Sequence, residues 1–227
     1  ITTATTNTGT LTLNGSSTVS GQVGDLTDSL KEINAGVAGS TSTFDSDVYA
    51  SNLKMIGSGT VNLNSNLTGN VVTTGNNQGI LTTTGANQTI TGNIGSSTSL
   101  DLGILNIGSD TVSANYSKTT INGDVFANST VLNNNGTTNS SELIMASGKN
   151  ITSTITTADD GKGILTLAGG TQTVSGTVGG VGASLAEVNA GNGITNFTND
   201  VYATNLDVEG TGTVNLNGNY TGTALRY

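Results

Sequence analysis

The sequence predicts an all-β protein, a right-handed parallel β-helix (β-solenoid) with roughly ten irregular coils. Three observations lead to this prediction: a long internal repeat, short strand-like runs within each repeat, and a composition of small uncharged residues. The phrase Asp-Val-aromatic-Ala occurs at residues 47–50, 124–127 and 200–203, at spacings of 77 and 76 residues. A repeat of this length, rich in Thr, Asn, Ser and Gly, indicates an array of stacked units.

Each repeat opens with alternating apolar and polar residues that end in glycine. A Gly-x-Leu-Thr run occurs at 9–12, 79–82 and 163–166. A second run, Thr-(Val/Ile)-x-Gly-x-(Val/Ile)-Gly, follows at 18–24, 89–95 and 173–179. Runs with a period of two that stop at glycine predict short, half-buried strands joined by tight corners.

Two later segments allow either a helical turn or a strand. Residues 29–36 and 184–191 each carry Ser, then Glu three residues later, then a closing Gly, which is the pattern of a capped helical turn. The middle repeat lacks the Glu and reads as extended over 99–108. We therefore expect a coil corner followed by a strand at all three places.

The repeats differ in length between their strand-like runs. Gly-Thr-Val-Asn-Leu-Asn occurs at 59–64 and 212–217, whereas the middle repeat has an Asn-rich stretch at 133–139 that reads as a loop. We expect a single solenoid segment of a longer chain, covering 1–227, with three degenerate repeats at about 9–78, 79–162 and 163–227.

The composition favours stacked coils over two alternatives. The chain has no Pro, and 9% of its residues are charged against about 25% in ordinary soluble domains, so it lacks the signature of disorder. Strand signals every 8–12 residues or so also fit a β-sandwich array, but the runs within one repeat resemble one another as stacked rungs do. Ladders of Asn and Thr then share hydrogen bonds along a rod about 50 Å long.

The same composition excludes several classes of function. A net charge of −9 and only six basic residues argue against nucleic acid, whose phosphates need clusters of Lys and Arg. The absence of Cys and His removes thiolate nucleophiles, the usual general base and the usual zinc ligands. No apolar stretch approaches ~18 residues, so we expect no direct membrane insertion of this segment.

The recurrent aspartates are the best candidates for oxygen ligands of Ca²⁺: Asp47, Asp124 and Asp200. Copies this far apart in sequence lie several turns apart, which is too far to share one ion. Asp45 precedes the first copy, yet its counterpart in the third repeat is Thr198. The glycines at 179–182 lack the Asp of a calcium-roll signature, and residues 159–161 form a single acidic turn. We therefore expect these acids to act in turns or caps, with no metal and no cofactor.

A carbohydrate-active β-helix enzyme is an alternative that the fold allows. A glycosidase needs two carboxylates that face one groove, with the pKa of one of them raised. No acidic pair recurs with aromatic neighbours, and Trp is absent. We predict no catalytic residue and no enzymatic activity.

Other side chains of interest also have structural explanations. The aromatic residues of the repeated phrase are expected to cap or fill a coil corner rather than form a binding stripe: Tyr49, Phe126 and Tyr202. Thr-x-Thr runs such as 171–173 are similar to flat ice-binding faces, but the Thr positions slip in register along the sequence. Asn-x-Ser/Thr sequons arise by chance in such a chain and matter only in a glycosylating host: Asn14, Asn66, Asn115 and Asn219.

Two longer phrases carry a resemblance to a known family. Leu-x-Glu-(Ile/Val)-Asn-Ala-Gly occurs at 30–36 and 185–191, and Asp-Val-Tyr-Ala-(Ser/Thr)-Asn-Leu occurs at 47–53 and 200–206. With the Gly-Thr-Val-Asn-Leu-Asn runs, they resemble rickettsial surface cell antigens, the outer membrane protein A and B autotransporters. The resemblance implies a secreted passenger domain, exported through a C-terminal β-barrel, that forms a β-helical rod, builds a surface layer and contributes to host-cell adhesion.

These observations define the expected function. We expect an extracellular, outer membrane-associated structural or adhesive module of a bacterial cell surface. Its expected partners are like subunits, packed laterally or end to end, and a host surface receptor, with no nucleic acid. The alternative is a self-assembling extracellular filament subunit.

Overall fold

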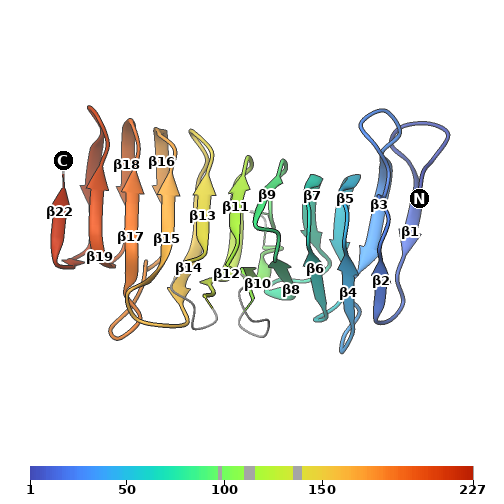
Figure 1. The fold of residues 1–227 in the computed structure, drawn as a ribbon, viewed down its shortest axis with the longest axis horizontal. Coiled ribbons are helices and arrows are strands. Elements are labelled where there is room, and N and C mark those ends of the chain that lie inside the picture. The colour runs from blue at the N-terminus through green and yellow to red at the C-terminus, as the bar shows by residue number, and fades with distance from the viewer. Residues whose placement is uncertain (97–98, 110–115, 135–139, 227) are drawn as a thin grey trace.

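The alternating runs of the sequence form short strands that stack in parallel along one axis. The computed structural model describes residues 1–96, 99–109, 116–134 and 140–226. In this part of the chain every strand pairing is parallel, no helix is present, and the strands build a β-solenoid of about nine turns. The stack is elongated, and its two termini lie at opposite ends (Figure 1). The predicted all-β parallel solenoid is therefore confirmed.

The strands form two sheets, and consecutive strands of the chain alternate between them except for the last two, which both belong to the first sheet. The first sheet has twelve strands: β1 (Thr8–Thr12), β3 (Leu30–Ala35), β5 (Val48–Met55), β7 (Leu67–Thr73), β9 (Asn87–Ile90), β11 (Lys118–Ile121), β13 (Glu142–Met145), β15 (Lys162–Leu167), β17 (Leu185–Ala190), β19 (Val201–Val208), β21 (Tyr220–Thr221) and β22 (Ala224–Arg226). The second has ten: β2 (Ser17–Val19), β4 (Thr41–Phe44), β6 (Thr60–Leu63), β8 (Gln78–Thr83), β10 (Leu102–Ile107), β12 (Val125–Leu132), β14 (Ile151–Thr157), β16 (Gly170–Val174), β18 (Gly193–Phe197) and β20 (Thr213–Leu216).

The segments that allow a helical turn are strands. They correspond to β3 and β17, and the extended middle counterpart is β10. In β3, Leu30, Ile33 and Ala35 are buried, and the strand pairs in register with β1 before it and β5 after it. The helical pattern is overridden by this pairing. In the Asn-rich stretch, residues 133 and 134 lie outside strands, and residues 135–139 lie outside the described part of the chain.

Inward side chains line up in columns, three of which run along the whole stack; shorter rows of buried side chains, such as Phe44, Leu63, Thr83, Ile107 and Leu132, lie beside them. Column 1 contains Val23, Val48, Leu67, Ile90, Ile121, Met145, Leu167, Ala190 and Val208. Column 2 contains Leu11, Ile33, Leu53, Val71, Ile94, Val125, Ile151, Val174, Phe197 and Leu216. Column 3 contains Ser17, Ser42, Val61, Leu81, Leu105, Thr130, Ile155, Val178, Val201 and Tyr220.

The sequence repeat is out of phase with these columns. The repeated valine is Val48 in column 1, Val125 in column 2 and Val201 in column 3. Three turns after Val48 the chain returns to column 1 at Ile121, and the next copy of the valine follows four residues later. Each repeat therefore takes three turns plus one step to the next column, so successive repeats are rotated about the solenoid axis.

The interior is mostly apolar and contains buried hydroxyl groups in all three repeats, among them Ser42 in the first, Thr119 in the middle and Thr195 in the third. Phe44 and Phe197 are fully buried in the first and third repeats. In the middle repeat the hydroxyl of Thr119 donates to that of Thr83 at 2.8 Å, and Thr119 also lies 3.0 Å from the hydroxyl of Ser117. Buried hydroxyl groups that pair with one another avoid the cost of unmet hydrogen bonds.

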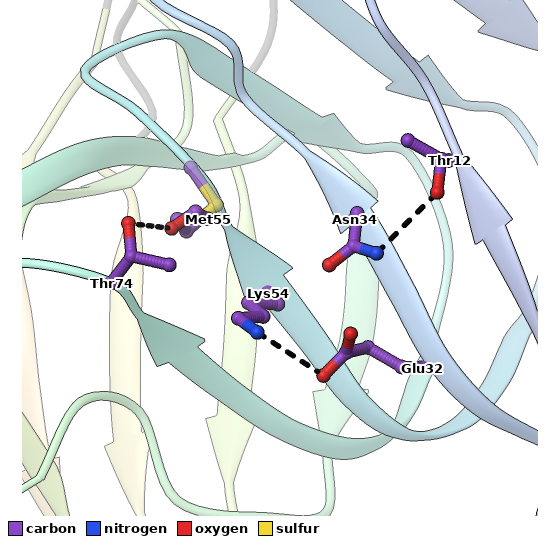
Figure 2. A network of polar contacts seen from close by, with 6 residues as sticks. All are labelled: Thr12, Glu32, Asn34, Lys54, Met55 and Thr74. Carbon is purple, nitrogen blue, oxygen red and sulfur yellow. Dashed lines mark hydrogen bonds and ion pairs between the residues drawn. The ribbon is translucent and has the colours of Figure 1, made fainter.

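Outward side chains connect neighbouring turns through polar contacts. In the first repeat, the Lys54 ammonium lies 3.6 Å from the Glu32 carboxylate, and the Asn34 amide donates to the Thr12 hydroxyl at 3.4 Å (Figure 2). Each of these contacts joins strands that are adjacent in the twelve-stranded sheet. Exposed ion pairs of this kind add little stability each, so burial in the columns is the main stabilising contribution.

We expect Leu105→Ala to destabilise the protein by about 2–5 kcal/mol, because Leu105 is fully buried in column 3 and its truncation leaves a cavity. Its neighbour Ile104 points outward and is half-buried, so Ile104→Ala is the matched control and should cost under about 1.5 kcal/mol. Urea denaturation measures both free energies of unfolding. Equal losses for the two variants would contradict the assignment of inward and outward positions.

Candidate functional site

The recurrent Asp-Val-aromatic-Ala phrase forms a corner between two strands in each repeat. We call these corners the aspartate corners, residues 44–50, 121–127 and 197–203. Each corner begins with a fully buried residue at the end of a strand: Phe44, Ile121 and Phe197. Three residues follow, the last of which is the aspartate. The buried valine of the next strand comes directly after it.

Each corner aspartate connects its own turn to the following turn. The Oδ1 atom of Asp47 accepts the backbone N–H of Asn66 at 3.1 Å. Asp124 and Asp200 make the same contact at 2.8 Å, with the backbone N–H groups of Asn150 and Asn219, respectively. The carboxylate thereby satisfies a backbone donor that a corner would otherwise leave unpaired.

Asparagine makes the same contact in turns that lack the aspartate. Asn70 accepts the N–H of Asn93 at 2.9 Å, Asn93 accepts that of Asp124 at 2.8 Å, and Asn150 accepts that of Thr173 at 2.8 Å. Together with Asp124 these residues form a continuous side-chain ladder over five turns. The sequence predicted ladders of Asn and Thr in general but did not identify these residues. Their signal is an Asn or Asp directly before an inward residue, as at Asn70, Asn93, Asp124 and Asn150.

A glycine of the preceding turn packs against the backbone of each corner aromatic. The aromatic N–H donates at 2.7 Å to the carbonyl before that glycine in all three repeats. These glycines have φ of 65°, 70° and 69°, and a Cβ would lie 2.4, 2.1 and 2.2 Å from the aromatic carbonyl oxygen: Gly24 against Tyr49, Gly95 against Phe126, and Gly179 against Tyr202. Only glycine fits here, because of both the left-handed backbone and the close approach.

The corner aromatics lie on the outer side of the coil and are half-buried. Tyr49, Phe126 and Tyr202 alternate with the buried valine and alanine of their strands. Each is paired in register with a threonine of the next turn. They therefore cover corners from outside, and because the corners belong to three different columns, the rings do not form one stripe along the axis.

Two shallow hollows lie beside the first and third aspartate corners, at equivalent positions of the repeat. The first has a volume of about 400 Å³ and is lined by Ser29, Ala50, Ser51, Thr68, Gly69, Asn70, Thr91 and Gly92. The second has a volume of about 290 Å³ and is lined by Asp160, Ser184, Ala203, Thr204, Thr221, Gly222 and Thr223. Their linings offer hydroxyl, amide and backbone groups for hydrogen bonding, with a single carboxylate in the second hollow.

In the middle repeat, Ser153 occupies the position that corresponds to Gly69 and Gly222. Its buried hydroxyl lies 2.9 Å from that of Thr130. The side chain here is buried inside the coil, whereas Gly69 and Gly222 line the two hollows.

The other acidic candidates also contact neighbouring turns. Asp45 accepts the side-chain amide of Asn64 at 2.8 Å, and Asp160 accepts the backbone N–H of Ser184 at 2.8 Å. Within the described ranges, no group of three or more Asp or Glu side chains is placed to hold a metal ion. Of the sequons, Asn66 and Asn219 belong to the corner contacts, and Asn115 lies outside the described residues.

Comparisons with known proteins gave no match. No protein-family model matches the chain, and neither the curated proteins nor the solved structures contain a significant match. Across the described residues, no helix has the length and apolarity needed to cross a membrane.

We expect Gly179→Ala to destabilise the protein more than Gly182→Ala. Both glycines have a left-handed backbone, with φ of 69° and 72°, so alanine costs about 1–2 kcal/mol at either position. A Cβ on Gly182 meets nothing within 4 Å, whereas one on Gly179 lies 2.2 Å from the Tyr202 carbonyl oxygen and must displace the next turn. Chemical denaturation should show a further loss of at least about 1 kcal/mol for Gly179→Ala. Equal losses would mean that the turns are not in close contact at this corner.

We expect Asp47 to make stability depend on pH under acidic conditions. The hydrogen bond from the Ser65 hydroxyl lowers the pKa of Asp47 below its ordinary value of 3.8, against the opposing effect of burial, and the Asn66 donors lower it further. Because the folded pKa is lowered, this contribution is present above pH 3.8 and is lost as the pH falls through the folded pKa. The free energy of unfolding of Asp47→Asn, measured in urea from neutral to acidic pH, should therefore fall less on acidification than that of the wild type.

The control is Asp159→Asn, which removes the same charge at an exposed turn. This variant should keep the acid dependence of the wild type. If Asp47→Asn and Asp159→Asn gave the same pH profile, the turn-linking hydrogen bonds of Asp47 would not be its source.

Proposed function

We propose that this chain is a structural and adhesive module of a bacterial cell surface, exported from the cell and built as a rod. The observation that carries the proposal is the continuous stack itself, in which three columns of side chains extend over about nine turns. At about 4.8 Å per turn, the described chain spans about 40 Å. A rod of this kind holds binding surfaces away from the membrane on which it is anchored.

The placement of the side chains supports this role. The corner aspartates and the asparagine ladder connect one turn to the next, so the recurrent polar residues stabilise the rod along its length. The outer surface is rich in hydroxyl and amide groups, which suits a surface in contact with water and with neighbouring molecules. The phrases that resemble rickettsial surface cell antigens favour the outer surface of a bacterium as the location.

A second candidate function is a filament subunit that assembles end to end. The observation that favours it is the parallel pairing of each described turn with the next, a geometry that a turn of another copy can continue. In this alternative, the first turn of one copy continues the last turn of another.

Surface location is tested on intact bacterial cells that express the protein. Antibodies raised against the purified chain should stain intact cells, and added protease should remove the staining.

Beads coated with the folded chain should bind cultured host cells better than beads coated with heat-denatured chain. Staining that requires permeabilised cells would refute the proposal, and equal binding by folded and denatured chain would refute its adhesive part. Electron micrographs of the purified chain that show long fibres instead of short rods would favour the filament.

A further inference from the structure

The asparagines of the side-chain ladder are protected from a reaction that asparagine undergoes in water. In this reaction the side-chain carbonyl carbon of asparagine bonds to the backbone nitrogen of the next residue. Each ladder asparagine is followed by Val or Ile, whose branched side chain crowds that nitrogen. Its side-chain oxygen is also held by a backbone N–H of the next turn. Both features keep the two reacting atoms apart.

Asparagine followed by glycine lacks the first form of protection, because glycine has no side chain to hinder the approach. Two such pairs have described turns on both sides, Asn122–Gly123 and Asn192–Gly193. Asn14 and Asn217 begin similar pairs in the first and last turns, and residues 135–136 form a pair outside the described residues. The two internal pairs have the same local sequence and differ in their contacts.

The side chain of Asn192 is bound to the next turn. Its Oδ1 atom accepts the backbone N–H of Thr211 at 2.9 Å and the Thr211 hydroxyl at 3.3 Å. Gly193 is the first residue of β18 and is paired in register with Gly170. The two hydrogen bonds of Asn192 must break before its side chain can turn towards the Gly193 nitrogen.

The side chain of Asn122 is free by comparison. It is exposed and makes no hydrogen bond with a described residue, and the N–H of Gly123 also has no partner among those residues. The backbone on either side is fixed. The Asn122 N–H donates to the Ile90 carbonyl at 2.9 Å, and the Asp124 N–H donates to Asn93 Oδ1 at 2.8 Å. The groups that react with each other are therefore the unbound part of this corner.

We propose that Asn122 is a site of spontaneous deamidation. The Gly123 nitrogen loses its proton and bonds to Cγ of Asn122, the bond from Cγ to the side-chain nitrogen breaks, and that nitrogen leaves as ammonia with the proton. Water then opens the cyclic imide at one of its two carbonyl carbons. Opening at Cγ gives aspartate, and opening at the main-chain carbon gives isoaspartate, in which the main chain continues through the side chain. Water is the only co-reactant.

The two products differ in how they fit the corner. The counterpart of Asn122 in the first repeat is Asp45, which accepts the side-chain amide of Asn64 at 2.8 Å, so an aspartate suits this position. Isoaspartate adds a methylene group to the main chain directly before Gly123. A Cβ on Gly123 would lie 2.3 Å from the carbonyl oxygen of Gly92, so this corner has no space for a displaced main chain. Isoaspartate should therefore weaken the pairing with the preceding turn.

The test follows both pairs by peptide mapping and mass spectrometry while the chain is incubated at neutral and mildly alkaline pH. In denaturant the two asparagines should react at similar rates, because each is followed by glycine. In the folded chain Asn122 should react at least about tenfold faster than Asn192, because two hydrogen bonds hold Asn192. The rate at Asn122 should rise with pH, because the attacking nitrogen must lose its proton.

Two results would overturn the proposal. One is an equal rate at the two asparagines of the folded chain. The other is a folded chain in which Asn122 stays intact over a period that converts it fully in denaturant. Neither result depends on where the chain is located, so the test is independent of the experiments on cells.

Two variants separate the change in the main chain from the change in charge. Asn122→Gln should prevent the reaction, because glutamine must form a larger ring, and Asn122→Asp introduces the charge without the extra methylene. An isoaspartyl methyltransferase should label this peptide in the aged wild type and leave it unlabelled in aged Asn122→Gln. The aged wild type should then unfold at a lower urea concentration than fresh wild type, while aged Asn122→Gln and fresh Asn122→Asp should not. A labelled wild type with an unchanged urea midpoint would support the site and overturn its effect on pairing.

Discussion

The structure depends on the in-register parallel pairing of each turn with the next. This pairing aligns the inward side chains into columns, and burial of these columns provides the apolar core of the coil. Pairing in register requires that equivalent corner residues of adjacent turns lie directly above one another along the solenoid axis. The corner aspartates, the asparagine ladder and the left-handed glycines meet this requirement, because each contacts the backbone of an adjacent turn.

The rotation of successive repeats has a consequence for function. Features that recur with the sequence, such as the aromatic corners, are distributed around the axis and do not combine into one surface. A surface that extends along the rod must instead be built from positions that are not equivalent in the repeats. One outward row of the ten-stranded sheet is such a surface: Thr41, Ile104 and Ser129 belong to it although they come from different phrases. The sequence repeat alone therefore does not identify the residues that form a surface along the rod.

The middle repeat differs from its neighbours in its interior as well as its length. At the position of Phe44 and Phe197 the middle repeat buries the smaller Ile121, and nearby it buries hydroxyl groups that pair with one another, as Thr119 does with Thr83. Each turn contacts only the turns beside it, so such a change is tolerated locally when the buried polar groups are satisfied. Ser153, which occupies the position of Gly69 and Gly222, belongs to the same pattern, since its hydroxyl pairs with that of Thr130 inside the coil.

Local sequence determined the class of fold and much of its secondary structure. Alternating Val, Ile, Leu and Thr with glycine stops predicted parallel strands, including β3, β10 and β17, because a period of two is intrinsic to a half-buried strand. It also indicated that Asp47 and its counterparts belong to turns. Only the tertiary structure decided how many residues each turn contains, and thus which side chains become neighbours. That number varies from 18 between Leu53 and Val71 to 31 between Ile90 and Ile121, because loops lengthen a turn without disturbing its pairing. The columns, the asparagine ladder and the outward row through Ile104 all follow from this register, which no single stretch of sequence contains.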